Sequence, residues 1–191
     1  MSEERYLAAV ERIYEAALEP NAWTAALDAL SRLFDAWCGH YLLWDDAAST
    51  TAFSVVSEHI PTKDEQAYTD HYGAIDPRRQ LVAERGDGKW ILCHEHFDER
   101  YVSRSEFYQD FLIPAGARYV AGVQLGQAHG LAAVLGILRA PGSRPYGEEE
   151  RRWLERILPD LRRASRFHLE LFRLRLHGSL VQQALDAVDH A

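Results

Sequence analysis

Residues 118–140 read RYVAGVQLGQAHGLAAVLGILRA, and this stretch decides the fold class. Two runs rich in β-forming residues, 118–126 and 131–140, are separated by the polar, glycine-containing segment Gln127–Gly130. Such a pattern predicts an antiparallel β-hairpin. The second run is apolar on both faces, which is typical of a central strand that is covered on both sides. We therefore expect a sheet with further layers packed on both of its faces.

Further strands are predicted on the N-terminal side of this hairpin. Residues 38–45 alternate between two faces, and residues 51–59 are rich in β-forming side chains. The small and polar residues between them suit a turn, so these two segments also predict a hairpin. Another strand is predicted at 89–97. Between the predicted strands 51–59 and 89–97, residues 62–85 have a helical pattern that we expect to break at Gly73.

Two amphipathic helices are predicted ahead of the first strand. The first has Ser2 in place to cap its N-terminus and ends before Pro20, and Asn21 is expected to cap the second. Neither helix can bury its apolar stripe alone, so both should pack on the sheet or on a partner. A further short helix is expected after Ser103-Arg-Ser-Glu106, which has the spacing of a capping box.

The C-terminal part of the chain predicts a long helix. Over residues 147–177, apolar side chains recur at steps of three and four, and Gly178-Ser179 should end the helix before a second capping box. About 30 residues at about 1.5 Å each span roughly 45 Å, which exceeds the width of a domain of this size. We therefore expect the excess to pair with a second copy of the chain. The predicted organisation is one unit, 1–177, followed by a helical segment, 178–191.

The predicted elements define a fold class. Their order is helix, helix, two strands, helices, strand, helix, two strands and a long helix. This order predicts an α+β fold in which an antiparallel sheet carries flanking helices and a long C-terminal helix. It suits the GAF/PAS type of sensory domain.

Composition limits the class of protein. Hydrophobic residues make up 47 % of the 191 residues and charged residues 26 %, which is ordinary for a globular domain and argues against disorder. The longest apolar run, 131–138, is too short to span a bilayer, and the acidic N-terminus is unlike a secretory signal. Two cysteines outside any CxxC motif fit a reducing compartment. We expect a cytoplasmic protein without membrane contact.

Charge is unevenly distributed along the chain. The net charge is −8, from 21 basic and 29 acidic residues, so the chain as a whole should repel nucleic acid. Between Arg151 and Arg175, however, there are eight arginines and three acids. A basic face could contact an anion, although arginines on a long helix more commonly form a solvated surface.

The segment 68–90, YTDHYGAIDPRRQLVAERGDGKW, contains the candidate site. An aspartate before a proline is a favoured helix N-cap, and the tyrosines and the tryptophan could be ordinary core residues. They could also line a pocket, where aromatic rings supply contact area and a buried carboxylate accepts a hydrogen bond from a ligand amide or amine. The candidate ligand-binding residues are aromatic or acidic: Tyr41, Tyr68, Tyr72, Asp76, Trp90, Phe107 and Phe111.

Part of this segment matches a known pattern through Tyr68, Tyr72, Asp76-Pro77 and Trp90. The series resembles the aromatic-x-x-x-Tyr, Asp-Pro and Trp positions of the autoinducer-binding domains of LuxR-type transcription regulators. The likeness continues through IYEAALEPNAWTAALDALSRLF, SEFYQDFLIPAGA and LGILRAPGSRPYGEEERRWLERILPDLRRA, and thus covers nearly the whole chain.

The resemblance implies a GAF-like sensory domain that dimerises through its terminal helices and controls an attached helix-turn-helix. Asp76 would then face a ligand amide, between aromatic walls, and the short helix around Phe107 and Phe111 would cover the pocket. No helix-turn-helix follows ALDAVDHA, so we expect DNA contact only through an output domain outside this chain.

A second candidate site involves the histidines of LCHEHF. His94 and His96 lie on one face of the predicted strand, a spacing at which two imidazoles can bind one metal ion. His40 and Glu95 are further potential ligands, but the pattern supplies no clear third one. Paired strand histidines are usually polar surface, and Cys93 shows no feature of a reactive thiol. We therefore predict no metal, no cofactor and no catalytic residue.

The sequence thus predicts a homodimeric sensory domain, not an enzyme, that binds a small, partly apolar molecule and passes the signal through the long helix. Two alternatives remain open. The first is a protein-interaction module without a ligand, which a core filled by Tyr72, Trp90 and Phe107 would favour. The second is a metal-dependent enzyme that uses His94 and His96.

Overall fold

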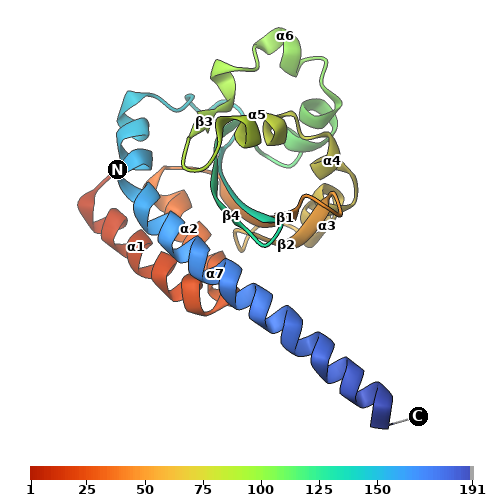
Figure 1. The fold of residues 1–191 in the computed structure, drawn as a ribbon. Helices are drawn as coiled ribbons and strands as arrows, with labels where there is room; N and C mark the ends of the chain where they lie inside the picture. Colours follow the sequence, from red (N-terminus) through yellow and green to blue (C-terminus); the bar gives the residue numbers. More distant parts are fainter. Residues whose placement is uncertain (190–191) are drawn as a thin grey trace.

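The fold is α+β, as predicted, with one antiparallel sheet between two layers of helices (Figure 1). A computed structural model describes residues 1–189, and residues 190 and 191 of the predicted segment 178–191 lie outside the described residues. The sheet has five strands in the order β2-β1-β5-β4-β3. The strands are β1 (Cys38–Asp45), β2 (Thr50–Val56), β3 (Ile91–Leu92), β4 (Tyr119–Ala128) and β5 (Leu131–Arg139).

The hairpin of β4 and β5 forms the centre of the sheet, and its prediction is confirmed. The two strands are joined by His129 and Gly130, with φ of 55° and 80°. Two consecutive positive φ values are the signature of the tight turn that matches the twist of paired strands. Strand β5 pairs with β1 on its other edge and is buried over most of its length, which explains why its sequence is apolar on both faces.

Three helices cover one face of the sheet: α1 (Glu3–Leu18), α2 (Trp23–Leu33) and α7 (Glu148–Asp189). The Ser2 side chain caps α1 by accepting a hydrogen bond from the Arg5 amide, as predicted. The predicted cap of α2 by Asn21 is wrong. Residues 20–22 form a 3₁₀ turn that leads directly into α2, so no side chain caps it.

Helix α7 is longer than predicted and projects beyond the body of the domain (Figure 1). It continues through Gly178-Ser179, where the sequence predicts its end. A single glycine costs a helix only about 1 kcal/mol relative to alanine, which neighbouring good helix formers can offset. Its 42 residues span about 63 Å at about 1.5 Å per residue. Arg156 of α7 forms a salt bridge with Glu3, which joins the first and last helices.

The other face is covered by α3 (Thr62–Ala67), α4 (Gly73–Ile75) and α5 (Pro77–Arg85). Residues 68–72 form a π-helical turn that joins α3 to α4 without interruption. The predicted break at Gly73 is therefore wrong, and the chain bends at Asp76 instead. Asp76 is extended (φ −65°, ψ 110°) because it precedes a proline and caps α5.

The segment between α5 and β4 has less regular structure than predicted. The expected strand at 89–97 is reduced to β3, after which Cys93–Glu95 form a 3₁₀ turn. Helix α6 (Glu99–Val102) and a π-helical turn, Phe107–Leu112, follow. The predicted capping box does not form, because the Ser103 hydroxyl donates to the carbonyl of Arg100.

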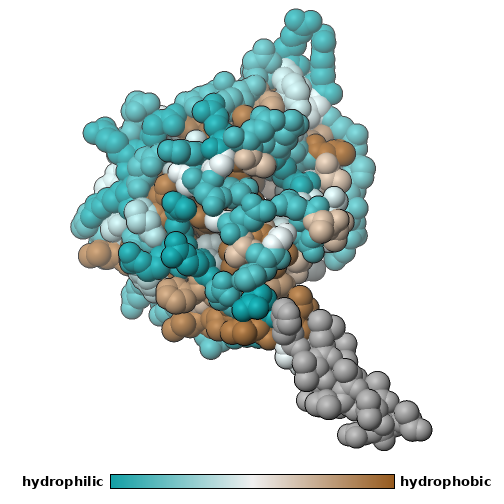
Figure 2. All heavy atoms as spheres, in the orientation of Figure 1, coloured by the Kyte–Doolittle hydropathy of each residue, from teal (hydrophilic) through white to brown (hydrophobic). Residues whose placement is uncertain are grey.

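The surface carries apolar side chains on the first and last helices. Leu7 and Leu18 of α1, with Phe167 and Leu174 of α7, are each more than half exposed. Figure 2 shows hydrophobic residues gathered along the lower edge of the body, near the point where α7 leaves it. Among the described residues, no helix combines the length and hydrophobicity that crossing a bilayer requires.

Candidate functional site

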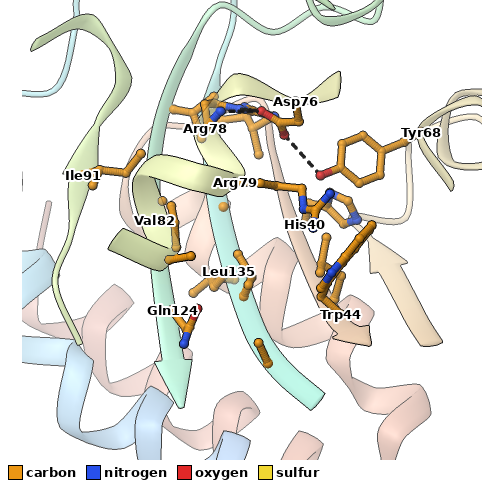
Figure 3. Close-up of a pocket in the computed structure, with 18 of the residues that line it drawn as sticks. His40, Trp44, Tyr68, Asp76, Arg78, Arg79, Val82, Ile91, Gln124 and Leu135 are labelled. Carbon is orange, nitrogen blue, oxygen red and sulfur yellow. Dashed lines mark hydrogen bonds and ion pairs between the residues drawn. The ribbon is translucent and has the colours of Figure 1, made fainter. Parts of the chain in front are cut away.

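A cavity lies between the sheet and α5 (Figure 3). It contains about 90 Å³ that the centre of a water molecule can occupy, on the order of six times the space that one ordered water needs. The sheet forms its floor, and α5 with the preceding π-helical turn forms its cover. The residues that line it include His40, Leu42, Trp44, Tyr68, Asp76, Arg78, Arg79, Val82, Ile91, Val120, Gly122, Gln124, Val134 and Gly136.

Missing side chains on the floor explain why this space exists. Gly122 of β4 and Gly136 of β5 are direct partners across the hairpin, so neither strand places a side chain there. A Cβ atom at Gly136 would lie 3.4 Å from the Leu138 side chain and 3.6 Å from that of Val120, which are ordinary contact distances. A side chain larger than alanine would therefore extend into the cavity.

Asp76 is held at the cavity by a closed set of hydrogen bonds. Its Oδ1 accepts from the amide of Arg78 at 2.9 Å and from the Nε of the same residue at 2.8 Å. Its Oδ2 accepts from the other arm of the guanidinium at 2.6 Å and from the Tyr68 hydroxyl at 3.1 Å. The two side chains of the ion pair retain only 4 % (Asp76) and 11 % (Arg78) of their exposure. This carboxylate therefore caps α5, neutralises Arg78 and fixes the Tyr68 ring.

The protonation states of these groups follow from the same contacts. Burial opposes the charged form of Arg78, but the charge and hydrogen bonds of Asp76 outweigh it and raise the pKa of Arg78. Burial and the negative charge of Asp76 also raise the pKa of Tyr68, so its hydroxyl stays protonated and donates. Burial, with the positive charge of Arg78, lowers the pKa of His40 to about 4, so this imidazole is neutral near pH 7.

Sequence reasoning left most of the cavity lining out of the site, including His40, Trp44, Arg78 and Arg79. The Arg79 guanidinium lies 3.1 Å from the centroid of the Trp44 ring and donates to the carbonyl of Gly73 at 2.9 Å. Figure 3 shows it reaching from α5 toward His40 and Trp44. The two strand residues could have been found, because alternation in 38–45 puts them on one face. Arg78 and Arg79 could not be found in this way, because their orientation depends on the bend of the chain at Asp76.

A second, smaller cavity of about 50 Å³ adjoins the first. The residues that line both cavities, and thus form the wall between them, are His40, Tyr68, Arg78 and Leu138. The Tyr68 ring packs edge-on against His40, with 4.9 Å between centroids.

Five of the seven predicted site residues lie on the cavity face of the sheet. Tyr68 and Asp76 line the main cavity, and Phe111 lines the smaller one. Tyr72 stacks on Phe111 with 4.6 Å between centroids, and Phe107 is buried beneath the guanidinium of Arg78. The rings of Tyr72 and Phe107 thus pack around the site without lining the main cavity.

The placement of Tyr41 and Trp90 in the same pocket is wrong. Neighbouring residues of a strand point to opposite faces, so Tyr41 faces away from the cavity that His40 and Leu42 line. Trp90 belongs to the core under α7, where its indole N–H donates to the carbonyl of Leu154 at 3.1 Å. The predicted tyrosine–aspartate–tryptophan pocket is therefore divided by the sheet.

Tyr41 instead joins the sheet to α7. Its ring stacks on Trp23 with 3.9 Å between centroids. Its hydroxyl lies 3.0 Å from Nδ1 of His168 and 3.1 Å from the hydroxyl of Ser165, both on α7. Burial, with the positive charge of Arg175, lowers the pKa of His168 to about 4. A neutral hydrogen-bonded cluster thus connects β1 to the long helix.

The two histidines of LCHEHF are separated by the irregular backbone. His94 lies in the 3₁₀ turn, and His96 follows it. Within the part of the chain that the structure describes, no three His, Cys, Asp or Glu residues are grouped closely enough to hold a metal ion. Cys93 is fully buried, and its sulfur accepts a hydrogen bond from the Val120 amide.

Solved structures share this fold. The domain superposes on CepR2 of Burkholderia cenocepacia, an N-acylhomoserine-lactone-dependent LuxR family transcription factor, with a TM-score of 0.59 and 18 % identity. This match covers 86 % of the present chain and 94 % of CepR2. The ligand-binding domain of VqsR from Pseudomonas aeruginosa gives a TM-score of 0.65 at 16 % identity, with 85 % and 94 % covered.

SdiA of Escherichia coli gives a TM-score of 0.52 at 14 % identity; the match covers 75 % of this chain and 58 % of SdiA. No protein-family model matches the sequence, and no curated protein is significantly similar to it. At these identities the structural likeness establishes the fold. The fold implied by the resemblance in the sequence is thus confirmed.

Proposed function

We propose that this chain is the small-molecule-binding sensory domain of a LuxR-type transcription regulator. The observation that carries the proposal is the partly enclosed cavity between the glycine pair of the hairpin and α5. Its lining is mostly apolar with a few fixed polar groups, which is the composition of small-molecule sites. The shared fold with ligand-binding domains of regulators supports a regulatory, not a catalytic, role.

A route for the signal leads from the cavity to α7 through β1. This strand presents His40 and Leu42 to the cavity, and between them Tyr41 bonds to His168 of α7. A ligand that displaces β1 would therefore also displace the contact between Tyr41 and His168, through which α7 packs on the sheet. A ligand acts by binding one arrangement better than another, and a coupling of about 1–3 kcal/mol changes the output substantially.

Dimerisation through the terminal helices is part of the proposal. Leu7, Leu18, Phe167 and Leu174 expose apolar surface on α1 and α7, which a second copy of the chain would cover. Helix α7 projects beyond the body and would carry the signal toward an output domain, such as a helix-turn-helix. Localisation in the cytoplasm and contact with DNA only through that output domain follow from this role.

The alternative role is a protein-interaction module without a ligand. The same exposed apolar residues favour it, as does the stacking of Tyr72 on Phe111, which fills space beside the cavity. The two roles differ in one property. A sensory domain is stabilised by a molecule that enters the cavity, whereas an interaction module is not.

The test is thermal unfolding with a library of small molecules, comparing the wild-type chain with Gly136→Val. The valine extends from the floor into the cavity and suits a strand, so the variant should fold. A ligand at about 100 times its dissociation constant stabilises the folded state by about 2.7 kcal/mol. We expect some molecules to stabilise the wild-type chain but not Gly136→Val. If no molecule does so, or if both proteins respond alike, the sensory proposal fails.

Asp76→Ala is a poorer probe of ligand binding. It would leave the Arg78 guanidinium buried without its carboxylate and would remove the cap of α5. A loss of ligand response in that variant would therefore be indistinguishable from partial unfolding. Filling the cavity from the floor leaves these contacts in place.

A further inference from the structure

The cavity has no free charged acceptor in its interior. Asp76 is its buried anion, and its two oxygens already accept four hydrogen bonds from Arg78 and Tyr68. A carboxylate has about four lone-pair sites, so this set is complete. A ligand N–H group can bind Asp76 only if one of these bonds breaks.

Arg79, in contrast, offers free donors and an unpaired positive charge. Of the five N–H groups of a guanidinium, one donates to the Gly73 carbonyl. Among the residues that the structure describes, no carboxylate lies within salt-bridge distance of Arg79. Its neighbour Arg78 is different, because Asp76 neutralises it through two hydrogen bonds from the guanidinium.

The other polar groups of the lining do not cancel this charge. His40 is neutral near pH 7, as its lowered pKa indicates. Asp46 lies at the exposed rim, where it accepts a hydrogen bond from Gln127 and is screened by water. Gln124 is neutral, and its amide nitrogen donates to Asp87. The cavity thus presents a half-buried cation beside apolar walls.

We propose that the cavity selects a small, largely apolar molecule that carries a carboxylate group, and that the Arg79 guanidinium binds this group. The inference rests on the proposed function, since it names the class of molecule that the same cavity takes. A planar guanidinium matches a carboxylate through two parallel hydrogen bonds, and stacking on Trp44 fixes its plane. The apolar part of the guest would lie against Val82, Ile91 and Val120.

The test uses probes that differ only in their polar group. The first set is 3-phenylpropanoate, 3-phenylpropanol and 3-phenylpropylamine, and the second is hexanoate, hexanol and hexylamine. Each is titrated calorimetrically into the wild-type chain near neutral pH. The carboxylates should bind on the order of ten- to a hundredfold more tightly than the alcohols, because a charge-assisted hydrogen bond contributes that much. The amines should bind more weakly than the alcohols.

Three variants locate the effect. Arg79→Gln should remove the preference for carboxylates but leave the affinity for the alcohols unchanged. Arg79→Lys should retain part of the preference, because it keeps the charge without the planar fork. Arg85→Gln is the matched control, since Arg85 is an exposed arginine at the far end of the same helix and does not line the cavity. Circular dichroism verifies that each variant is folded.

The outcomes separate this inference from the proposed function. If alcohols or amines bind as tightly as carboxylates, or if Arg79→Gln keeps the preference, the carboxylate assignment is wrong while the cavity still takes ligands. If none of the six probes binds, the assignment is also wrong, and the wider library with Gly136→Val decides whether the sensory function survives. A carboxylate preference that depends on Arg79 supports both.

Discussion

Replacing Asp76 by alanine is expected to destabilise the domain by about 3–5 kcal/mol. The ion pair with Arg78 is almost fully buried, and removal of one partner of such a pair leaves an uncompensated charge away from water. The helix cap of α5 is lost in the same step, which accounts for about 1 kcal/mol of the total. Because a domain of this size has a stability of only about 5–15 kcal/mol, the variant should be close to unfolding.

A double-mutant cycle separates the charge effect from the loss of packing. Arg78→Met removes the cation and keeps most of the side-chain volume, so Asp76→Ala combined with Arg78→Met should be more stable than Asp76→Ala alone. Tyr68→Phe removes one hydrogen bond to the same carboxylate and leaves the ion pair in place, so it should cost about 1.5–3 kcal/mol.

Urea unfolding followed by circular dichroism gives each free energy of unfolding. We expect a coupling energy between Asp76 and Arg78 of about 2 kcal/mol or more. A cost below about 1 kcal/mol for Asp76→Ala, or additive effects of the two substitutions, would refute the assignment of Asp76 and Arg78 as a buried, energetically coupled ion pair.

Three further predictions concern α7. Between about pH 6.5 and 4 the unfolded chain binds protons that native His168 and His40 do not, so each of the two histidines should lower the stability by up to about 3 kcal/mol as the pH drops through this window. In urea titrations across that range, His168→Asn should reduce the slope of stability against pH by about half, since His40 still titrates; an unchanged slope would contradict the neutral buried imidazole of His168. Under the proposed dimerisation through α1 and α7, Phe167→Asp should convert the dimer to a monomer in sedimentation, with exposed Arg166→Asp as control. An unaltered mass would remove this surface from the proposed interface. Gly178→Ala should raise helicity and stabilise the helix locally by about 1 kcal/mol, whereas a helix that ended there would lose its C-cap.

Local patterns were sufficient to predict the sheet and its principal layers. The hairpin of residues 118–140 is fixed by strand-forming runs around a glycine turn, and the strand at 38–45 by its alternation. Helix ends were less predictable. The helical segment bends at Asp76 instead of Gly73, because a proline follows the aspartate, and α7 passes through Gly178 because one glycine is a small cost in a long helix.

The candidate site was predictable only in part. Tyr68 and Asp76 were found because Tyr68 lies four residues before Tyr72, on the same helical face, and Asp76 precedes a proline and caps a helix. The assignment of Trp90 to the pocket failed, because β3 is too short to reveal by alternation which face its flanking residues occupy. Arg79 was missed for a different reason. Its contact with Trp44 joins segments more than 30 residues apart, and no local pattern encodes such a contact.

The most direct measurement is a crystal structure of the domain with the best-stabilising compound from the library. We expect electron density for the compound above Gly122 and Gly136, beneath α5, with its polar group beside Arg79. Density at another place would contradict it. So would a structure in which the Tyr68 and Trp44 rings close the space and leave no room above the glycine pair.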